Sequence, residues 1–181
     1  MTGRLVALLR GINVGRAKRV AMADLRSLVS GLGYRDVATV LNSGNVLLTA
    51  PGVAPGDAAA AIEGALAARV GVRARVTVLR AEELAAAVAD NPLGGVATDP
   101  SRLLVAFLQS PADRSRVEPL LAEDWSPEAL ALGRRVAYLW CPGGVLASRL
   151  PEAIGHALGD AVTIRNWATV TRLHALAGAS G

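Results

Sequence analysis

The chain has 181 residues, of which 52% are hydrophobic and 19% are charged. This length and hydrophobic share predict a folded protein with its own core, and they exclude intrinsic disorder. The formal net charge is +4, and residues 1–23 carry the bases Arg4, Arg10, Arg16, Lys18 and Arg19 without any acid, which predicts a basic patch near the start of the chain.

Targeting and redox signals are weak. No apolar run reaches the about 18 residues that a membrane span needs. The first apolar run, residues 5–9, is short and is followed at once by Arg10, unlike a secretory signal. The single cysteine, Cys141, lies in an apolar run and is expected to be a buried thiol. We therefore expect a cytoplasmic protein without membrane association.

The first 80 residues follow a strand and helix order typical of one fold. An apolar run at residues 5–9 predicts a buried strand, residues 11–19 a loop, and the spacing of apolar positions from Met22 to Leu32 a helix. Two further strands are expected at 37–41 and 45–49, a helix at 55–70 and a strand at 73–79. The order β-α-β-β-α-β is that of ferredoxin-like folds.

The same order is expected again in the second half. A helix at 81–89 leads into residues 90–100, which are rich in proline, glycine and aspartate and predict a boundary. A strand at 103–108, a helix at 111–122 that Pro119 ends early or kinks, and a hairpin of 129–132 with 136–141 follow. A helix at 148–158, a short strand at 162–164 and a closing helix at 167–176 complete the chain.

These elements predict an α+β protein built from two ferredoxin-like halves packed into one two-lobed molecule, with a C-terminal helix. The predicted division is residues 1–80 for the first half, 81–100 for a connecting helix and linker, and 101–181 for the second half. The first strand is apolar on both faces, and helices cover only one face of such a sheet. The other face must pack on the second half or on another subunit, so a homodimer stays open.

The loop after the first strand is the first candidate binding segment. Gly11 and Gly15 would let backbone N–H groups approach a ligand, and the following helix start favours an anion. The segment matches neither a Walker loop nor a dinucleotide fingerprint. A solvated basic loop without a ligand is the alternative interpretation.

Topology brings a second segment to the same place. The first and third strands of this fold are antiparallel neighbours, so Arg10 and Gly11 should lie beside the turn formed by Ser43, Gly44 and Asn45. A hydroxyl, an amide and several cations at one sheet edge would form a polar recognition site. A simple turn explains the same residues without a ligand.

The third candidate segment is Arg165, Asn166 and Trp167. Asn166 after a strand is a good helix cap. Arg165 could instead face a ligand, with Trp167 beside it.

The sequence has little that is typical of a catalytic or metal-binding site, and we expect no cofactor and no metal. His156 and His174 lie on separate predicted helices without ligand spacing. Phe107, Tyr138 and Trp140 lie on strands that could present aromatic rings to RNA. Because the alternate positions on those strands are also apolar, we interpret these three rings as core.

Several motifs, in order along almost the whole chain, resemble the bacterial family known as domain of unknown function 1697. They are residues 7–15 (ALLRGINVG), 22–26 (MADLR), 42–46 (NSGNV), 91–92 (NP) and 163–167 (TIRNW). The resemblance implies an α+β fold with ferredoxin-like halves. The recurrent polar positions of the family correspond to Arg10, Asn13, Lys18, Ser43, Asn45, Arg165 and Asn166. The chain departs from the family pattern at Arg16, Ala17 and Ala168.

These observations predict a protein that binds an anionic ligand, either single-stranded nucleic acid or a phosphorylated small molecule. Arg10, Lys18 and Arg165 would pair with phosphate, and Asn13, Ser43 and Asn45 would orient the ligand. The predicted site residues are Arg10, Gly11, Asn13, Gly15, Lys18, Ser43, Gly44, Asn45, Arg165, Asn166 and Trp167. Two alternatives stay open: an enzyme that uses the same loops to stabilise negative charge, and an assembly module whose loops are only solvated.

Overall fold

The computed structural model describes residues 3–179, and contacts divide the chain into two compact units. Unit 1 consists of the described residues up to Leu84 and those from Leu173 onward, and unit 2 is Ala85–Arg172. Helices α3 (Ala81–Ala89) and α6 (Trp167–Gly178) continue across the two division points. The division predicted from the sequence places all of the closing helix, α6, in the second half. In the structure, the residues of α6 from Leu173 onward belong to unit 1.

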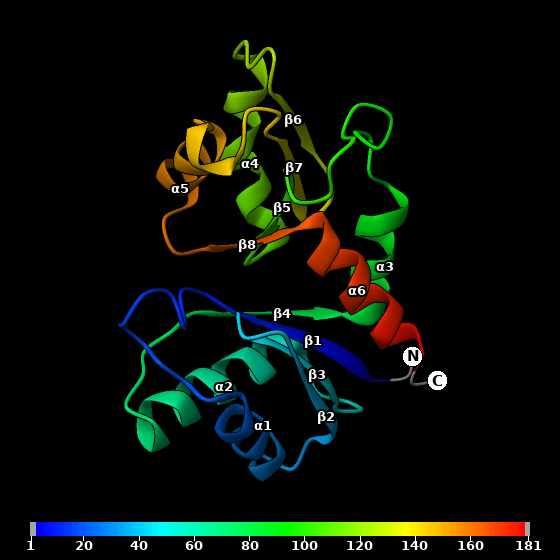
Figure 1. Cartoon of the computed structure of the whole chain (residues 1–181). Coiled ribbons are helices and arrows are strands. Elements are labelled where there is room, and N and C mark those ends of the chain that lie inside the picture. The colour runs from blue at the N-terminus through cyan, green and yellow to red at the C-terminus, as the bar shows by residue number, and fades with distance from the viewer. Residues whose placement is uncertain (1–2, 180–181) are drawn as a thin grey trace. The chain divides into compact units, whose positions relative to one another are not determined.

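Unit 1 contains one four-stranded antiparallel sheet in the order β2-β3-β1-β4. Its elements are β1 (Arg4–Leu9), α1 (Met22–Gly31), β2 (Arg35–Val40), β3 (Asn45–Thr49), α2 (Pro55–Arg69) and β4 (Val76–Arg80), and α1 and α2 lie on the same face of the sheet (Figure 1). In the register, Leu8 pairs with Asn45 and Leu9 with Val76. The end of β1 therefore lies between the starts of β3 and β4.

The core of unit 1 follows from the alternation of apolar residues in β1. Leu5, Ala7 and Leu9 face the helices and join a cluster with Leu25 of α1 and Ile62 of α2. The alternate residues Val6 and Leu8 are also fully buried. An uninterrupted apolar run such as residues 5–9 of β1 is expected where both faces of a strand are excluded from water.

Unit 2 contains a second four-stranded antiparallel sheet, in the order β6-β7-β5-β8. Its strands are β5 (Leu103–Leu108), β6 (Ala129–Leu132), β7 (Val136–Trp140) and β8 (Val162–Asn166). Helices α4 (Arg114–Val117) and α5 (Leu150–Leu158) cover one face, where Val117 and Ile154 join a buried cluster with Ala106 of β5 and Leu139 of β7 (Figure 1). If the strands of each unit are numbered from the first strand of that unit, both sheets have the order 2-3-1-4.

The segment between β5 and β6 differs from a single helix. It consists of a 3₁₀ turn (Pro111–Asp113), α4 and a second 3₁₀ turn (Glu118–Ala122). The interruption predicted at Pro119 is confirmed, because α4 ends at Val117. Proline has no N–H to donate and its ring clashes with the preceding helical turn, so the α-helix cannot continue through it.

Other element boundaries shift by a few residues. The strand expected at 162–164 extends to Asn166, so Arg165 pairs with Val105 inside the sheet. The strand expected at 73–79 is β4, Val76–Arg80, and the helix expected from residue 148 begins at Leu150. The predicted α+β class with two ferredoxin-like halves is confirmed by the two sheet orders. Among the helices of residues 3–179, none is both long and apolar enough to cross a bilayer.

Candidate functional site

The loop that follows β1 folds back on itself at one end of the unit 1 sheet. We call residues 10–19 the basic loop. Gly11, Asn13, Gly15 and Lys18 all have positive φ angles, of 70°, 54°, 62° and 50°. Val14 and Ala17 form an isolated antiparallel bridge. The loop is therefore a defined small hairpin, in which two non-glycine residues adopt the left-handed backbone region that they seldom occupy.

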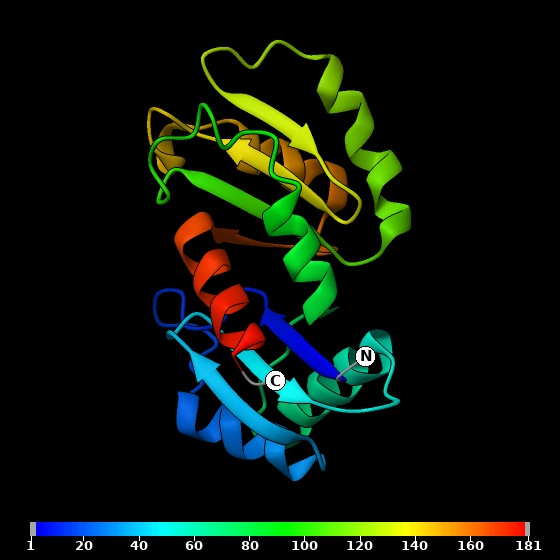
Figure 2. The ribbon, with the colours of Figure 1, turned by 90° about the vertical axis from the view of Figure 1, so that its right-hand side faces the viewer.

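Asn13 fastens the basic loop to the turn between β2 and β3. Its Nδ2 donates to the carbonyl oxygens of Val20 and Asn42, both at 2.9 Å, and its Oδ1 accepts from the Val20 N–H at 2.9 Å. Its own backbone N–H donates to the Lys18 carbonyl at 3.0 Å. The sequence predicted that these two segments would be neighbours, and this is confirmed (Figure 2). Both the Nδ2 and the Oδ1 of Asn13 therefore form hydrogen bonds within the protein.

Gly44 permits close packing of that turn against β1. The Leu9 N–H donates to the Gly44 carbonyl at 2.9 Å. A Cβ at Gly44 would lie 2.8 Å from Cδ1 of Ile12 and 2.9 Å from Cβ of Leu9, and the residue has a φ of 84°. Glycine is required here for space as well as for backbone conformation.

Asn45 is fully buried at the start of β3. Its Nδ2 donates to the Val40 carbonyl at 2.8 Å and to Ser43 Oγ at 2.9 Å. Both N–H groups of the amide therefore fix the shape of the β2–β3 turn. Ser43 is exposed, and its hydroxyl takes part in this turn as an acceptor.

The cations are the exposed part of the site. Arg16, Lys18 and Arg19 are exposed, and within residues 3–179 their side chains form no ion pair. Arg10 is half-buried, and its backbone N–H donates to the Arg75 carbonyl at 2.9 Å. This contact adds a basic segment that the sequence analysis missed, since Arg73 and Arg75 are both exposed just before β4. The pairing of β1 with the last strand of the half was the signal that could have found it.

The remaining predicted site residues belong to unit 2. Asn166 accepts a hydrogen bond from the Thr169 N–H on its Oδ1 at 2.9 Å, which confirms its predicted role as a helix cap. Burial lowers the pKa of the Arg165 guanidinium to about 10, and its Nη1 donates to the Ile164 carbonyl at 2.9 Å. Trp167, the first residue of α6, is half-buried.

The aromatic residues of unit 2 do not form a platform for bases. Phe107 and Tyr138 are 0% and 1% exposed, and Trp140 is 9% exposed. The interpretation of these rings as core is confirmed. Cys141 is buried as predicted, and burial raises the pKa of its thiol. The described residues contain no cluster of three or more histidine, cysteine, aspartate or glutamate side chains that could hold a metal ion.

Comparisons with known proteins agree with this architecture. A conserved bacterial protein from Streptococcus pneumoniae has a similar structure, with a TM-score of 0.78 and 22% sequence identity, over 96% of this chain and 98% of that chain. At this identity the likeness shows the fold alone. A search of curated proteins finds no match. The sequence model of the family described as "Protein of unknown function (DUF1697)" matches residues 1–138. The chain therefore belongs to the DUF1697 family.

Proposed function

We propose that the protein binds a phosphate-bearing ligand at the end of the unit 1 sheet, through the basic loop and the start of β4. The single observation that carries this proposal is the set of exposed cations on a preformed loop. Arg16, Lys18 and Arg19 have no acidic partner within residues 3–179. Unpaired cations that are close together repel one another, and a phosphate group would relieve that repulsion.

The glycines give a phosphate access to the backbone. A Cβ at Gly11 or at Gly15 would meet no described atom within 4 Å, so the main chain at both positions is open to solvent. Backbone N–H groups in such positions add neutral donors to the charged ones. Gly11 and Gly15 would therefore contact the ligand directly.

Asn13 and Asn45 would not orient the ligand, which is the role that the sequence predicted for them. Both N–H groups of Asn45 and the whole amide of Asn13 are engaged with the protein itself. We therefore assign Asn13, Asn45 and Gly44 to positioning the basic loop and the β2–β3 turn. Arg10, Lys18 and the neighbouring arginines would contact the phosphate.

Single-stranded nucleic acid is the ligand that this arrangement favours. The cations are spread over two segments, residues 10–19 and 73–75, and all of them except Arg10 are exposed. Several spaced cations match the repeated phosphates of a polyanion better than the single phosphate of a metabolite. The buried aromatic residues of unit 2 argue for contacts to the sugar-phosphate backbone and not for base stacking.

The test is a pair of double variants with the same loss of charge. Arg16→Gln/Lys18→Gln removes two loop cations, and Arg26→Gln/Arg35→Gln removes two exposed cations from α1 and from the start of β2. Fluorescence anisotropy of a labelled oligouridylate should show about a tenfold or greater loss of affinity for the loop variant alone.

Equal affinity of the two variants would contradict a site at the loop. Binding of pyrophosphate or of a mononucleotide, but not of the oligonucleotide, with the same loss in the loop variant, would keep the site and replace the ligand by a phosphorylated metabolite. Arg165, Asn166 and Trp167 stay a predicted contribution from unit 2. The bacterial source, the cytoplasmic location and a homodimer also stay predictions.

A further inference from the structure

Unit 2 contains an open groove that the proposed function does not use. Its volume is about 550 Å³, within the range of about 300–1,000 Å³ that is usual for small-molecule sites. The lining residues come from the segment just after α3, from the 3₁₀ turn with the start of α4, and from the β6–β7 hairpin. They are Asp90, Pro92, Pro111, Arg114, Leu132, Gly133, Arg134 and Tyr138.

The groove carries two opposite charges that are not paired with each other. In the part of the chain that the structure describes, neither the Asp90 carboxylate nor the Arg134 guanidinium forms an ion pair or a side-chain hydrogen bond. Both residues are exposed. Asp90 lies close enough to Tyr138 to contribute, after burial, to raising the pKa of that phenol to about 12. A carboxylate and a guanidinium are thus held in one groove, each available to a ligand.

Pro92, Pro111 and Leu132 add apolar groups to the lining of the groove. Tyr138 donates its hydroxyl to the Ala87 carbonyl at 2.6 Å, so its ring contributes to the lining while its polar end is satisfied. A Cβ at Gly133 would lie 3.3 Å from Cε2 of Tyr138 and 3.0 Å from Cγ2 of Val136. The absence of a side chain at Gly133 therefore lets the β6–β7 hairpin pack closely against this buried ring.

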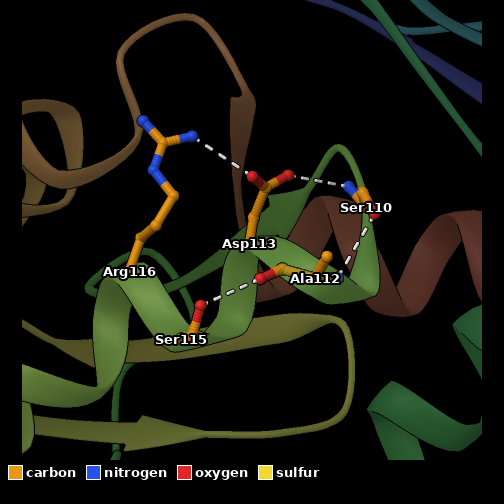
Figure 3. Close-up of polar contacts among 5 residues, drawn as sticks. All are labelled: Ser110, Ala112, Asp113, Ser115 and Arg116. Atoms are coloured by element: carbon orange, nitrogen blue, oxygen red, sulfur yellow. Dashed lines mark hydrogen bonds and ion pairs between the residues drawn. The ribbon is translucent and has the colours of Figure 1, made fainter.

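One wall of the groove is fixed by local hydrogen bonds. Ser110 Oγ accepts from the Ala112 N–H at 3.2 Å, and Asp113 Oδ2 accepts from the Ser110 N–H at 3.0 Å (Figure 3). This capping box holds Pro111 at the start of the helical segment. Arg114 is anchored by bonds from Nε to the Gly133 carbonyl and from Nη1 to Glu118, both at 3.0 Å.

We propose that this groove binds a zwitterionic ligand, an α-amino acid or a short peptide, with its ammonium group on Asp90 and its carboxylate on Arg134. The apolar lining would contact a hydrophobic side chain of that ligand. Charge complementarity selects this chemistry, because an anion alone would leave Asp90 without a partner and would be repelled by it.

The experiment uses the whole protein and small probes that differ by one charge. L-leucine and L-leucyl-L-leucine carry both charges, N-acetyl-L-leucine lacks the ammonium group, and L-leucinamide lacks the carboxylate. Titration followed by amide shifts in NMR should show the zwitterions perturbing the groove residues. Each singly charged probe should bind about tenfold more weakly. Stronger binding of the dipeptide would indicate peptides as the natural ligand, and equal binding would indicate free amino acids.

Two variants and one control locate the interaction. Asp90→Asn and Arg134→Gln should each weaken binding of the zwitterion about tenfold. Arg116→Gln is the matched control, since Arg116 lies on α4 beside the groove but is not among the lining residues, and it pairs with Asp113 at 3.2 Å (Figure 3). The proposal is overturned if no zwitterion shifts the groove residues, or if the singly charged probes bind as well as the zwitterions. It is also overturned if the control loses as much affinity as the two groove variants.

Discussion

At the scale of single residues, the site at the end of the unit 1 sheet separates positioning groups from contacting groups. The Asn13 amide holds the basic loop to the β2–β3 turn, and the Asn45 amide fixes the shape of that turn. The guanidinium and ammonium groups of Arg16 and Lys18 face solvent. This division could not be predicted from residue types, because an asparagine suits a turn and a ligand equally well. It depends on the left-handed backbone at Asn13, which turns the amide toward Asn42.

Gly44 offers the sharpest test of this positioning. Gly44→Ala would place Cβ within 2.9 Å of Ile12 and Leu9 at a φ of 84°, whereas Gly52→Ala has a similar φ of 77° and no described atom within 4 Å. Both variants incur about 1–2 kcal/mol for the backbone conformation. Gly44→Ala should lose about 1–3 kcal/mol more through overpacking. Urea unfolding measures both losses, and equal destabilisation would show that the turn does not pack against β1 as described.

Tyr138 gives a prediction about pH. Burial, with a smaller contribution from Asp90, raises the pKa of its phenol to about 12. Because the unfolded chain releases this proton near its ordinary value of 10.0, the stability that Tyr138 contributes is complete below that pH and falls as pH rises toward about 12. The chain has two tyrosines, so ultraviolet titration of the wild type and of Tyr138→Phe isolates this group. A Tyr138 phenol that ionises at its ordinary pKa would be inconsistent with its burial.

At the scale of elements, most helices and strands could be predicted because apolar spacing, glycine stops and proline breaks each depend on only a few neighbouring residues. The end of α1 at Gly31, with Gly33 just beyond it, and the interruption at Pro119 in the segment after β5 are examples. The start of β4 at Val76 was less predictable. Arg73 and Arg75 alternate with apolar residues as they would in a strand, yet the ladder begins only where Val76 pairs with Leu9. Tertiary pairing, and not the local pattern, decides that boundary.

The capping box at the start of the α4 segment gives a prediction at this scale. Ser110→Ala removes the acceptor of the Ala112 N–H, while Ser115→Ala removes only a bond from an exposed hydroxyl to the Ala112 carbonyl (Figure 3). Loss of an N-cap costs about 1 kcal/mol, and an exposed surface change costs within about 0.5 kcal/mol. Chemical denaturation should therefore rank Ser110→Ala as the more destabilised variant. The reverse order would mean that the cap does not hold this segment.

At the scale of the whole molecule, the β-α-β-β-α-β order could be predicted because apolar spacing and turn residues mark the elements of each half separately. That order predicts β3 as a neighbour of β1, and it therefore predicts that the basic loop lies beside the β2–β3 turn. The structure shows this contact. The same order makes β4 the other neighbour of β1, and this pairing brings the Arg75 carbonyl to the Arg10 N–H. The groove of unit 2 has no sequence signal, since its residues come from three separate segments.

The central claim is that the basic loop binds phosphates, and the salt dependence of nucleic-acid binding tests it most directly. Fluorescence anisotropy of labelled single-stranded RNA and DNA would be titrated across a salt series with the wild type and with Arg16→Gln/Lys18→Gln. Each phosphate neutralised on a single strand contributes about −0.7 to the slope of log affinity against log salt. We predict a wild-type slope of about −2 or steeper, which the double variant flattens by about 1.4. Binding that does not depend on salt, or a slope that the variant leaves unchanged, would contradict the claim.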